Sequence, residues 1–186
     1  MNEINKIGLI GSAGIGKGSV ASKISNKLDL FFLKSKDITR PILEKYNYDE
    51  KYYPCIEKFL SHKNIEFEIV NTRMQKEYLL QGGFITDRTT LECFVYALLS
   101  VESYENKEIT ELENICRENM KQYNYIFYFP FKNGWLEDNG IRTVNNYFQW
   151  KIDLMIRGLI NDWNINAITV PAENPVDFII NKIKQE

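Results

Sequence analysis

Histidine occurs once and cysteine three times in this chain of 186 residues. Cys55, Cys93 and Cys116 are odd in number and widely spaced, so they indicate neither a disulfide framework nor a cysteine-based metal site. No apolar run approaches the roughly 18 residues that a membrane-spanning helix needs. The opening stretch, MNEINKIG, lacks the basic-then-apolar pattern of a signal peptide. We therefore expect a cytoplasmic protein without a membrane partner.

A basic excess is also missing, because 23 Lys and Arg residues are balanced by 25 Asp and Glu residues. Proteins that bind nucleic acid without regard to sequence carry a clear positive excess. We therefore disfavour nucleic acid as a partner, although a local basic pocket stays compatible with the composition. The length suits one domain over residues 1–186, and no repeat, low-complexity tract or linker divides the chain.

Short apolar runs alternate with helical patterns along the whole chain. Strands are predicted over 4–10, 30–33, 82–86, 123–129 and 166–170. Helices are predicted from Lys17 and over 39–47, 65–81, 89–100, 108–121, 143–163 and 174–184, with Pro41 in the first turn of the second. This alternation predicts an α/β fold of three layers, with a five-stranded parallel sheet and helices on both faces.

The stretch GSAGIGKGS follows the first predicted strand and opens a helix. It matches the phosphate-binding pattern G-x-x-x-x-G-K, in which glycines let the backbone aim N–H groups at phosphate oxygens. Lys17 would supply a mobile charge for the β- and γ-phosphates. These features predict a P-loop that binds ATP. The predicted ATP contacts are Gly11, Ser12, Ala13, Gly14, Ile15, Gly16, Lys17, Gly18 and Ser19.

The loop departs from the general motif at Gly18, where a Ser or Thr usually holds Mg²⁺. A hydroxyl comes one position later, on Ser19. This G-K-G-[ST] form resembles the phosphate loop of adenylate kinases and other nucleoside monophosphate kinases. The resemblance implies that Ser19 contacts an inner phosphate and that Mg²⁺ is held largely through waters.

Asp87 ends the third predicted strand, at the same sheet edge as the loop. It is a candidate to orient a water on Mg²⁺ or to act as general base toward an acceptor hydroxyl. A helix N-cap is the structural alternative, although Thr89 and Glu92 already have capping-box spacing. The planar fork of Arg88 would point at the transferring phosphate.

The stretch TRMQKEYLLQGGFITDRTTLECFVYAL resembles the middle of thymidylate kinases and deoxynucleoside kinases across about 27 residues. In those families an Arg and a Gln on a helix precede a strand that ends in Asp-Arg or Glu-Arg. The resemblance implies that Arg73 and Gln75 lie near the acceptor's base or phosphate. It also implies that Arg88 acts on the transferring phosphate.

Nearly the full length resembles a group of small P-loop ATPase and kinase-like proteins that includes the nicotinamide riboside kinase domain. Asp37 and Arg40 match its acidic-x-x-Arg segment, which implies acceptor binding. LEDNGIR, which ends at Arg142, matches a late acidic-x-Gly-x-Arg segment. Related kinases place a lid here, so residues 130–142 are the predicted lid, and Arg142 is a candidate to close onto the transition-state charge.

These features predict a kinase that transfers the γ-phosphate of Mg-ATP to a nucleoside or a nucleoside monophosphate. A hydroxyl acceptor needs a base such as Asp87 or Asp37, whereas a phosphate acceptor needs cations, and the residues suit both. One alternative is a regulatory NTPase switch, and another is a kinase acting on a nucleotide within DNA or RNA. Related kinases are often dimers, which implies a possible homodimer.

Overall fold

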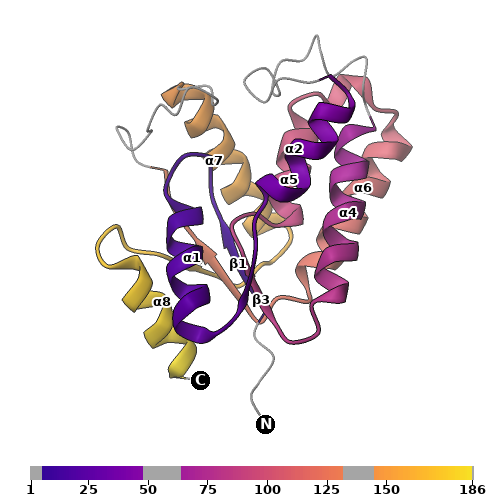
Figure 1. Ribbon diagram of the computed structural model, residues 1–186. Helices are drawn as coiled ribbons and strands as arrows, with labels where there is room; N and C mark the ends of the chain where they lie inside the picture. Colours follow the sequence, from indigo (N-terminus) through magenta and orange to yellow (C-terminus); the bar gives the residue numbers. More distant parts are fainter. Residues whose placement is uncertain (1–5, 48–63, 132–144, 186) are drawn as a thin grey trace.

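Five parallel strands form the middle layer of the computed structural model, in the order β2-β3-β1-β4-β5 (Figure 1). The structure describes residues 6–47, 64–131 and 145–185. The strands are β1 (Lys6–Ile10), β2 (Phe31–Leu33), β3 (Phe84–Thr86), β4 (Tyr125–Tyr128) and β5 (Ala167–Thr169). The predicted five-stranded parallel sheet is confirmed.

Helices cover both faces of this sheet. They are α1 (Lys17–Leu28), α2 (Lys36–Lys45), α4 (Ile65–Leu79), α5 (Thr90–Leu98), α6 (Asn106–Met120), α7 (Asn146–Asp162) and α8 (Pro175–Lys184), with a 3₁₀ turn η2 (Val101–Ser103). Figure 1 shows α1 and α8 on one side and α4, α5 and α6 on the other. Across the described ranges, no helix has the length and apolarity to cross a membrane.

Side chains of successive strand residues enter two separate cores. On β4, Tyr125 and Phe127 pack with residues of α1 and α8, whereas Ile126 and Tyr128 pack with residues of the opposite layer. This is the period-two alternation of a strand whose faces are both buried. The predicted three-layer arrangement is therefore confirmed.

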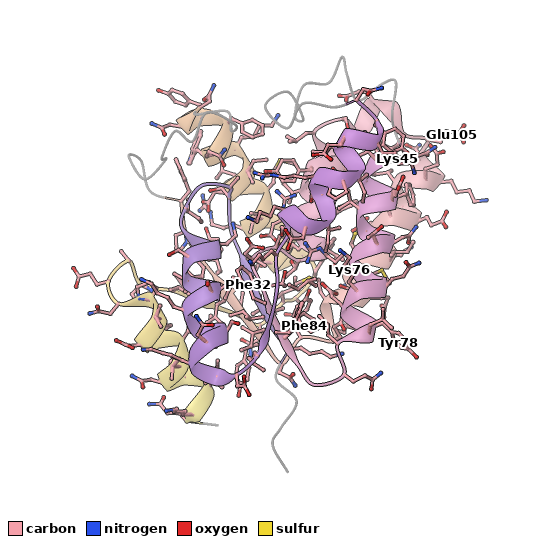
Figure 2. The ribbon with its side chains drawn as sticks, in the orientation of Figure 1. Phe32, Lys45, Lys76, Tyr78, Phe84 and Glu105 are labelled. Carbon is pink, nitrogen blue, oxygen red and sulfur yellow. The ribbon has the colours of Figure 1, made fainter. Side chains whose placement is uncertain are left out.

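Helix α2 corrects one prediction. It begins at Lys36 rather than at residue 39, so Pro41 lies in its interior and not in its first turn. Proline has no N–H, which leaves the carbonyl of Asp37 without its usual donor four residues on. Lys76 Nζ donates to that carbonyl at 3.1 Å, and Figure 2 shows Lys76 on α4. A donor from a neighbouring helix thus compensates for the interior proline.

Parallel strands end at one edge of the sheet, and this edge positions the candidate site. The loop after β1, the residues after β2 and the residues after β3 all meet there, because β3 lies between β1 and β2. Thr86 pairs in register with Gly8 and with Leu33. Residues that follow these strands are therefore neighbours in space, although they are far apart in the chain.

Candidate active site

Glycines with positive φ bend the loop between β1 and α1. Gly11 has φ of +146°, and a Cβ there would lie 2.6 Å from the carbonyl oxygen of Phe129. Gly16, which precedes the first residue of α1, has φ of +87°. Both conformations disfavour a residue with a side chain. They curl the chain into the turn that a phosphate-binding loop requires.

Lys17 folds back into this loop. Its side chain is 8% exposed, and Nζ donates to the carbonyl oxygens of Gly11 and, at 2.7 Å, of Ser12. The ammonium group therefore lies inside the curl, at the place where phosphate oxygens would bind.

Glu92 connects the loop to the start of α5. Its Oε1 accepts from the Gly11 N–H at 3.2 Å, and its Oε2 accepts from the Thr89 N–H at 2.8 Å. The predicted capping box of Thr89 and Glu92 is confirmed. Burial raises the pKa of the Glu92 carboxyl, and the nearby Lys17 ammonium opposes that rise. A capping box does not predict the contact between Glu92 and the Gly11 N–H, which fixes the first glycine of the loop.

A cavity of about 460 Å³ opens in front of the loop, bounded by residues of α1, α2, α5 and α7 and by those that follow β2 and β3. Most of the predicted loop contacts line it. They are Gly11, Ala13, Gly14, Gly16, Lys17, Gly18 and Ser19. Ser12 and Ile15 are buried and do not line the cavity.

Asp87 faces the loop from the end of β3. Its Oδ1 accepts from the Ser35 N–H at 2.8 Å, and its Oδ2 lies 3.1 Å from where a Cβ on Gly18 would stand. A larger residue at position 18 would therefore press on the carboxylate. The N-cap of α5 is Thr89, so Asp87 is not the cap.

The oxygens around Asp87 fit Mg²⁺. The carboxylate and the Ser19 hydroxyl both line the cavity beside the loop, and such oxygens are the ligands that Mg²⁺ prefers. Within the described ranges, no group of three or more His, Cys, Asp or Glu residues could hold a metal ion. Mg²⁺ commonly binds through one or two carboxylates together with substrate phosphates and waters, which suits this donor set.

The guanidinium group of Arg88 lies over an aromatic ring, and its N–H donors are available for a ligand. Its Cζ is 4.7 Å from the centroid of the Tyr96 ring. Among the described residues, no hydrogen bond or ion pair involves its guanidinium. Burial alone would lower the pKa of Arg88, but Tyr96, Cys93, Glu92 and Glu66 together raise it above the usual value. The fork is thus held charged at the cavity wall, where it could bind a phosphate.

The position of Arg73 differs from the expectation that this residue contacts the acceptor. Its side chain is fully buried and does not line the cavity. Nη1 donates to the carbonyl oxygen of Arg88 at 2.7 Å, to Thr86 Oγ1 at 3.0 Å and to Glu77 Oε1 at 3.3 Å, and Nη2 donates to Ser35 Oγ at 3.0 Å. Arg73 therefore holds the ends of β2 and β3 together from behind the cavity and is a positioning residue.

The remaining predicted residues separate into three groups. Arg40 lines the cavity from α2. Asp37 and Gln75 are exposed and do not line it, so the structure does not place these two expected acceptor-binding residues at the cavity. Arg142, and the predicted lid from residue 132 onward, lie outside the described residues. The cavity also contains polar residues that the sequence did not single out, among them the buried Thr39 and Gln149. Each lies on a helix face with buried isoleucines, and a polar residue at such a position was the available signal.

Glu66, on the first turn of α4, is a buried carboxyl group behind Arg88. It is 1% exposed, and its Oε1 has no hydrogen-bond partner within the described chain. Burial raises the pKa of Glu66 to about 8, and the charge of Arg88 opposes the rise. The folded protein therefore holds this proton more tightly than the unfolded chain does.

This proton makes stability depend on pH. A carboxyl whose pKa is higher in the folded state binds more protons when folded, so the free energy of unfolding falls as pH rises from about 4.5 to about 8. We expect Glu66→Gln to remove that fall, on the order of a few kcal/mol. Urea unfolding of both proteins at pH 6 and pH 9 measures it. Glu68→Gln is the control, because Glu68 lies two residues further along the same helical turn and is hydrogen-bonded to Lys45. If Glu66→Gln showed the same difference in stability between the two pH values as the wild type, the assignment of this proton to Glu66 would be wrong.

Comparison with known proteins places this geometry in a family. A family model described as an AAA domain matches residues 6–177. No curated protein matches the chain by sequence.

Several solved structures share the fold. The NadR protein in complex with NR has a TM-score of 0.71 and 15% identity, over 98% of this chain and 51% of that one. The present chain thus spans about half the length of NadR. Deoxyadenosine kinase from M. mycoides with bound dATP has a TM-score of 0.67 and 16% identity, over 97% and 99% of the two chains. Thymidylate kinase from Candida albicans has a TM-score of 0.58 and 19% identity, over 98% and 90%. The chain has the fold of the small P-loop kinases.

Proposed function

The chain belongs to the AAA domain family, and from this premise we propose that it is a phosphotransferase. It would move the γ-phosphate of ATP to a nucleoside or a nucleoside monophosphate. One observation carries the proposal: Lys17, Asp87 and the unused fork of Arg88 line one cavity, and that cavity continues beyond them. A site built only for hydrolysis needs no such additional space next to the γ-phosphate.

Each group in the cavity would have its own role in binding ATP or in phosphoryl transfer. Backbone N–H groups of the loop and the ammonium group of Lys17 would bind the β- and γ-phosphates. Arg88 would bind the transferring phosphoryl group as its charge develops, which is where most of the rate enhancement in such reactions arises. Rotation of Lys17 Nζ from the carbonyls of Gly11 and Ser12 onto phosphate oxygens would accompany ATP binding.

Asp87 fits a role on the metal side of the site. Its Oδ2 faces Gly18 in the loop, and its Oδ1 is already engaged by the Ser35 N–H. Mg²⁺, when bound, would neutralise charge on the phosphates. The carboxylate would orient a water on that ion and so help fix the phosphate position.

ADP release from Mg-ATP, with and without pools of nucleosides or nucleoside monophosphates, tests the proposal. We expect one pool to raise ADP release well above background. Asp87→Asn keeps an oxygen for the Ser35 N–H and should lower the raised rate about 100-fold while increasing the Mg²⁺ concentration required. A loss confined to hydroxyl acceptors would instead identify Asp87 as a general base. If no pool changes a slow ATP hydrolysis, the regulatory NTPase is the better account.

A further inference from the structure

The cavity has a second half beyond Asp87 and Arg88. Side chains of α2, α5 and α7 line this half. Four apolar or aromatic side chains line this half: Leu43, Tyr96, Phe148 and Ile152. Such walls favour the flat face of a ring over a small, strongly hydrated group.

Two buried polar side chains in this half have no hydrogen-bond partner. Thr39 is 6% exposed and Gln149 is 3% exposed, and both line the cavity. Thr39 Oγ1 and Gln149 Oε1 find no partner in the part of the chain that the structure describes. A buried polar atom without a partner has lost its hydrogen bonds to water and gained none in exchange, which is unfavourable. A ligand that supplies the missing partners would recover this free energy.

Gln149 is held at a fixed place by the helix that carries it. One turn further along α7, Asp153 accepts from Tyr128 Oη at 2.7 Å and from the Phe131 N–H at 3.0 Å. At the start of the helix, Asn145 Oδ1 accepts from the Phe148 N–H at 3.0 Å. The Asp153 contacts tie α7 to β4 and the residues after it, and the Asn145 contact caps the start of the helix. The backbone that carries Gln149 is therefore fixed relative to the sheet, and burial to 3% exposure limits the space in which its side chain can move.

We propose that this half of the cavity binds a planar heterocyclic ring of the acceptor, and that Gln149 pairs with the polar edge of that ring. A side-chain amide presents an acceptor and two donors in one plane, which matches the adjacent donor and acceptor on a nucleobase edge. Thr39 donates to or accepts from a substituent of the same acceptor. This inference rests on the proposed function, because it assigns the acceptor end of the same cavity.

Gln149→Leu tests the assignment, with kcat and KM measured for ATP and for each nucleoside and nucleoside monophosphate. We expect kcat/KM for the preferred acceptor to fall about tenfold to a hundredfold, chiefly through KM, with KM for ATP unchanged. The variant should unfold at the same temperature or higher, because the removed oxygen has no partner to lose. Asn161→Leu, at the exposed far end of α7, is the matched control and should match the wild type.

Gln149→Glu gives a second, independent outcome. A carboxylate only accepts hydrogen bonds, so this variant should shift preference toward bases whose edge carries an amino group. If both variants keep the wild-type order of acceptors, the inference is wrong although the kinase activity stands. The inference is also wrong if the acceptors are small sugars or carboxylic acids, which carry no planar heterocyclic ring.

Direct binding separates this inference from the proposed function. If no compound stimulates ADP release, the kinase proposal fails. Equilibrium dialysis of the same nucleosides against protein with a non-hydrolysable ATP analogue then tests whether this half of the cavity binds a ring. Binding that Gln149→Leu weakens tenfold or more would support it. Absence of binding by every ring-bearing compound would overturn it.

Discussion

Replacing Lys17 with methionine should remove nearly all acceptor-dependent ADP release, a fall of about 100-fold to 1,000-fold. Methionine keeps an apolar stem of similar length but carries no charge for the β- and γ-phosphates. It also leaves the carbonyls of Gly11 and Ser12 without the ammonium donor that holds the loop. Glu92 would lose the cation that most opposes the effect of burial, so the pKa of its carboxyl should rise further.

The control for this experiment lies on the same helix. Lys23 is exposed on α1 and does not line the cavity, so Lys23→Met should leave ADP release within twofold of the wild type. Thermal unfolding of both variants checks that the chain still folds. If Lys17→Met retained a third or more of the wild-type rate, the loop would not be the phosphate site, and the proposed function would fail with it.

Replacing Arg73 with methionine should lower the free energy of unfolding by about 3–5 kcal/mol, the range for breaking a buried ion pair from one side. Arg73 and Glu77 are both fully buried, so the variant leaves a carboxylate inside the core without its cation. The backbone carbonyl of Arg88 and the Ser35 hydroxyl also lose a donor. Urea unfolding measures the change, and we expect a melting temperature lower by roughly 10 °C.

A double variant separates the charge from the packing. Arg73→Met combined with Glu77→Leu removes both charges, so it should recover part of the lost stability. Arg117→Met, exposed on α6, should change stability by less than about 0.5 kcal/mol. A loss below about 1 kcal/mol in Arg73→Met would mean that the buried network does not hold the sheet edge together.

The layers of the fold could be predicted because each strand and helix carries its own pattern. Apolar runs such as YIFY and the helical stripe of α7 place their side chains by local periodicity alone. The error at Pro41 has a different origin. The carbonyl that an interior proline leaves free is satisfied by Lys76, which belongs to another helix. No local pattern around Pro41 contains that donor.

The position of the loop could be predicted from its motif, whereas the depth of Arg73 and Gln75 could not. The resemblance placed both Arg73 and Gln75 at the acceptor, yet residues two apart on a helix point to nearly opposite sides. The structure turns Arg73 into the core and Gln75 to solvent. A motif aligned by spacing identified the right helix but not the depth at which each side chain lies.

Thr39 and Gln149 were missed for a related reason. Each lies on a helix that the sequence assigns to core packing, and only the meeting of α2, α5 and α7 makes them line a cavity. Gln149 is three residues before Ile152 and seven before Ile156, both buried. A glutamine on such a stripe either finds a partner in the core or faces a ligand. Deciding between the two requires the three-dimensional arrangement.

The short distance between Asp87 and Gly18 also constrains how a sequence of this kind can vary. The carboxylate and a side chain at position 18 would compete for the same space, because only 3.1 Å separates Oδ2 from the Cβ position. Substituting serine or threonine after the lysine should therefore require the Asp87 carboxylate to move by a few tenths of an ångström. The identity of residue 18 and the position of the Asp87 carboxylate are thus linked, so a larger residue in the loop should shift the oxygen that would face the metal.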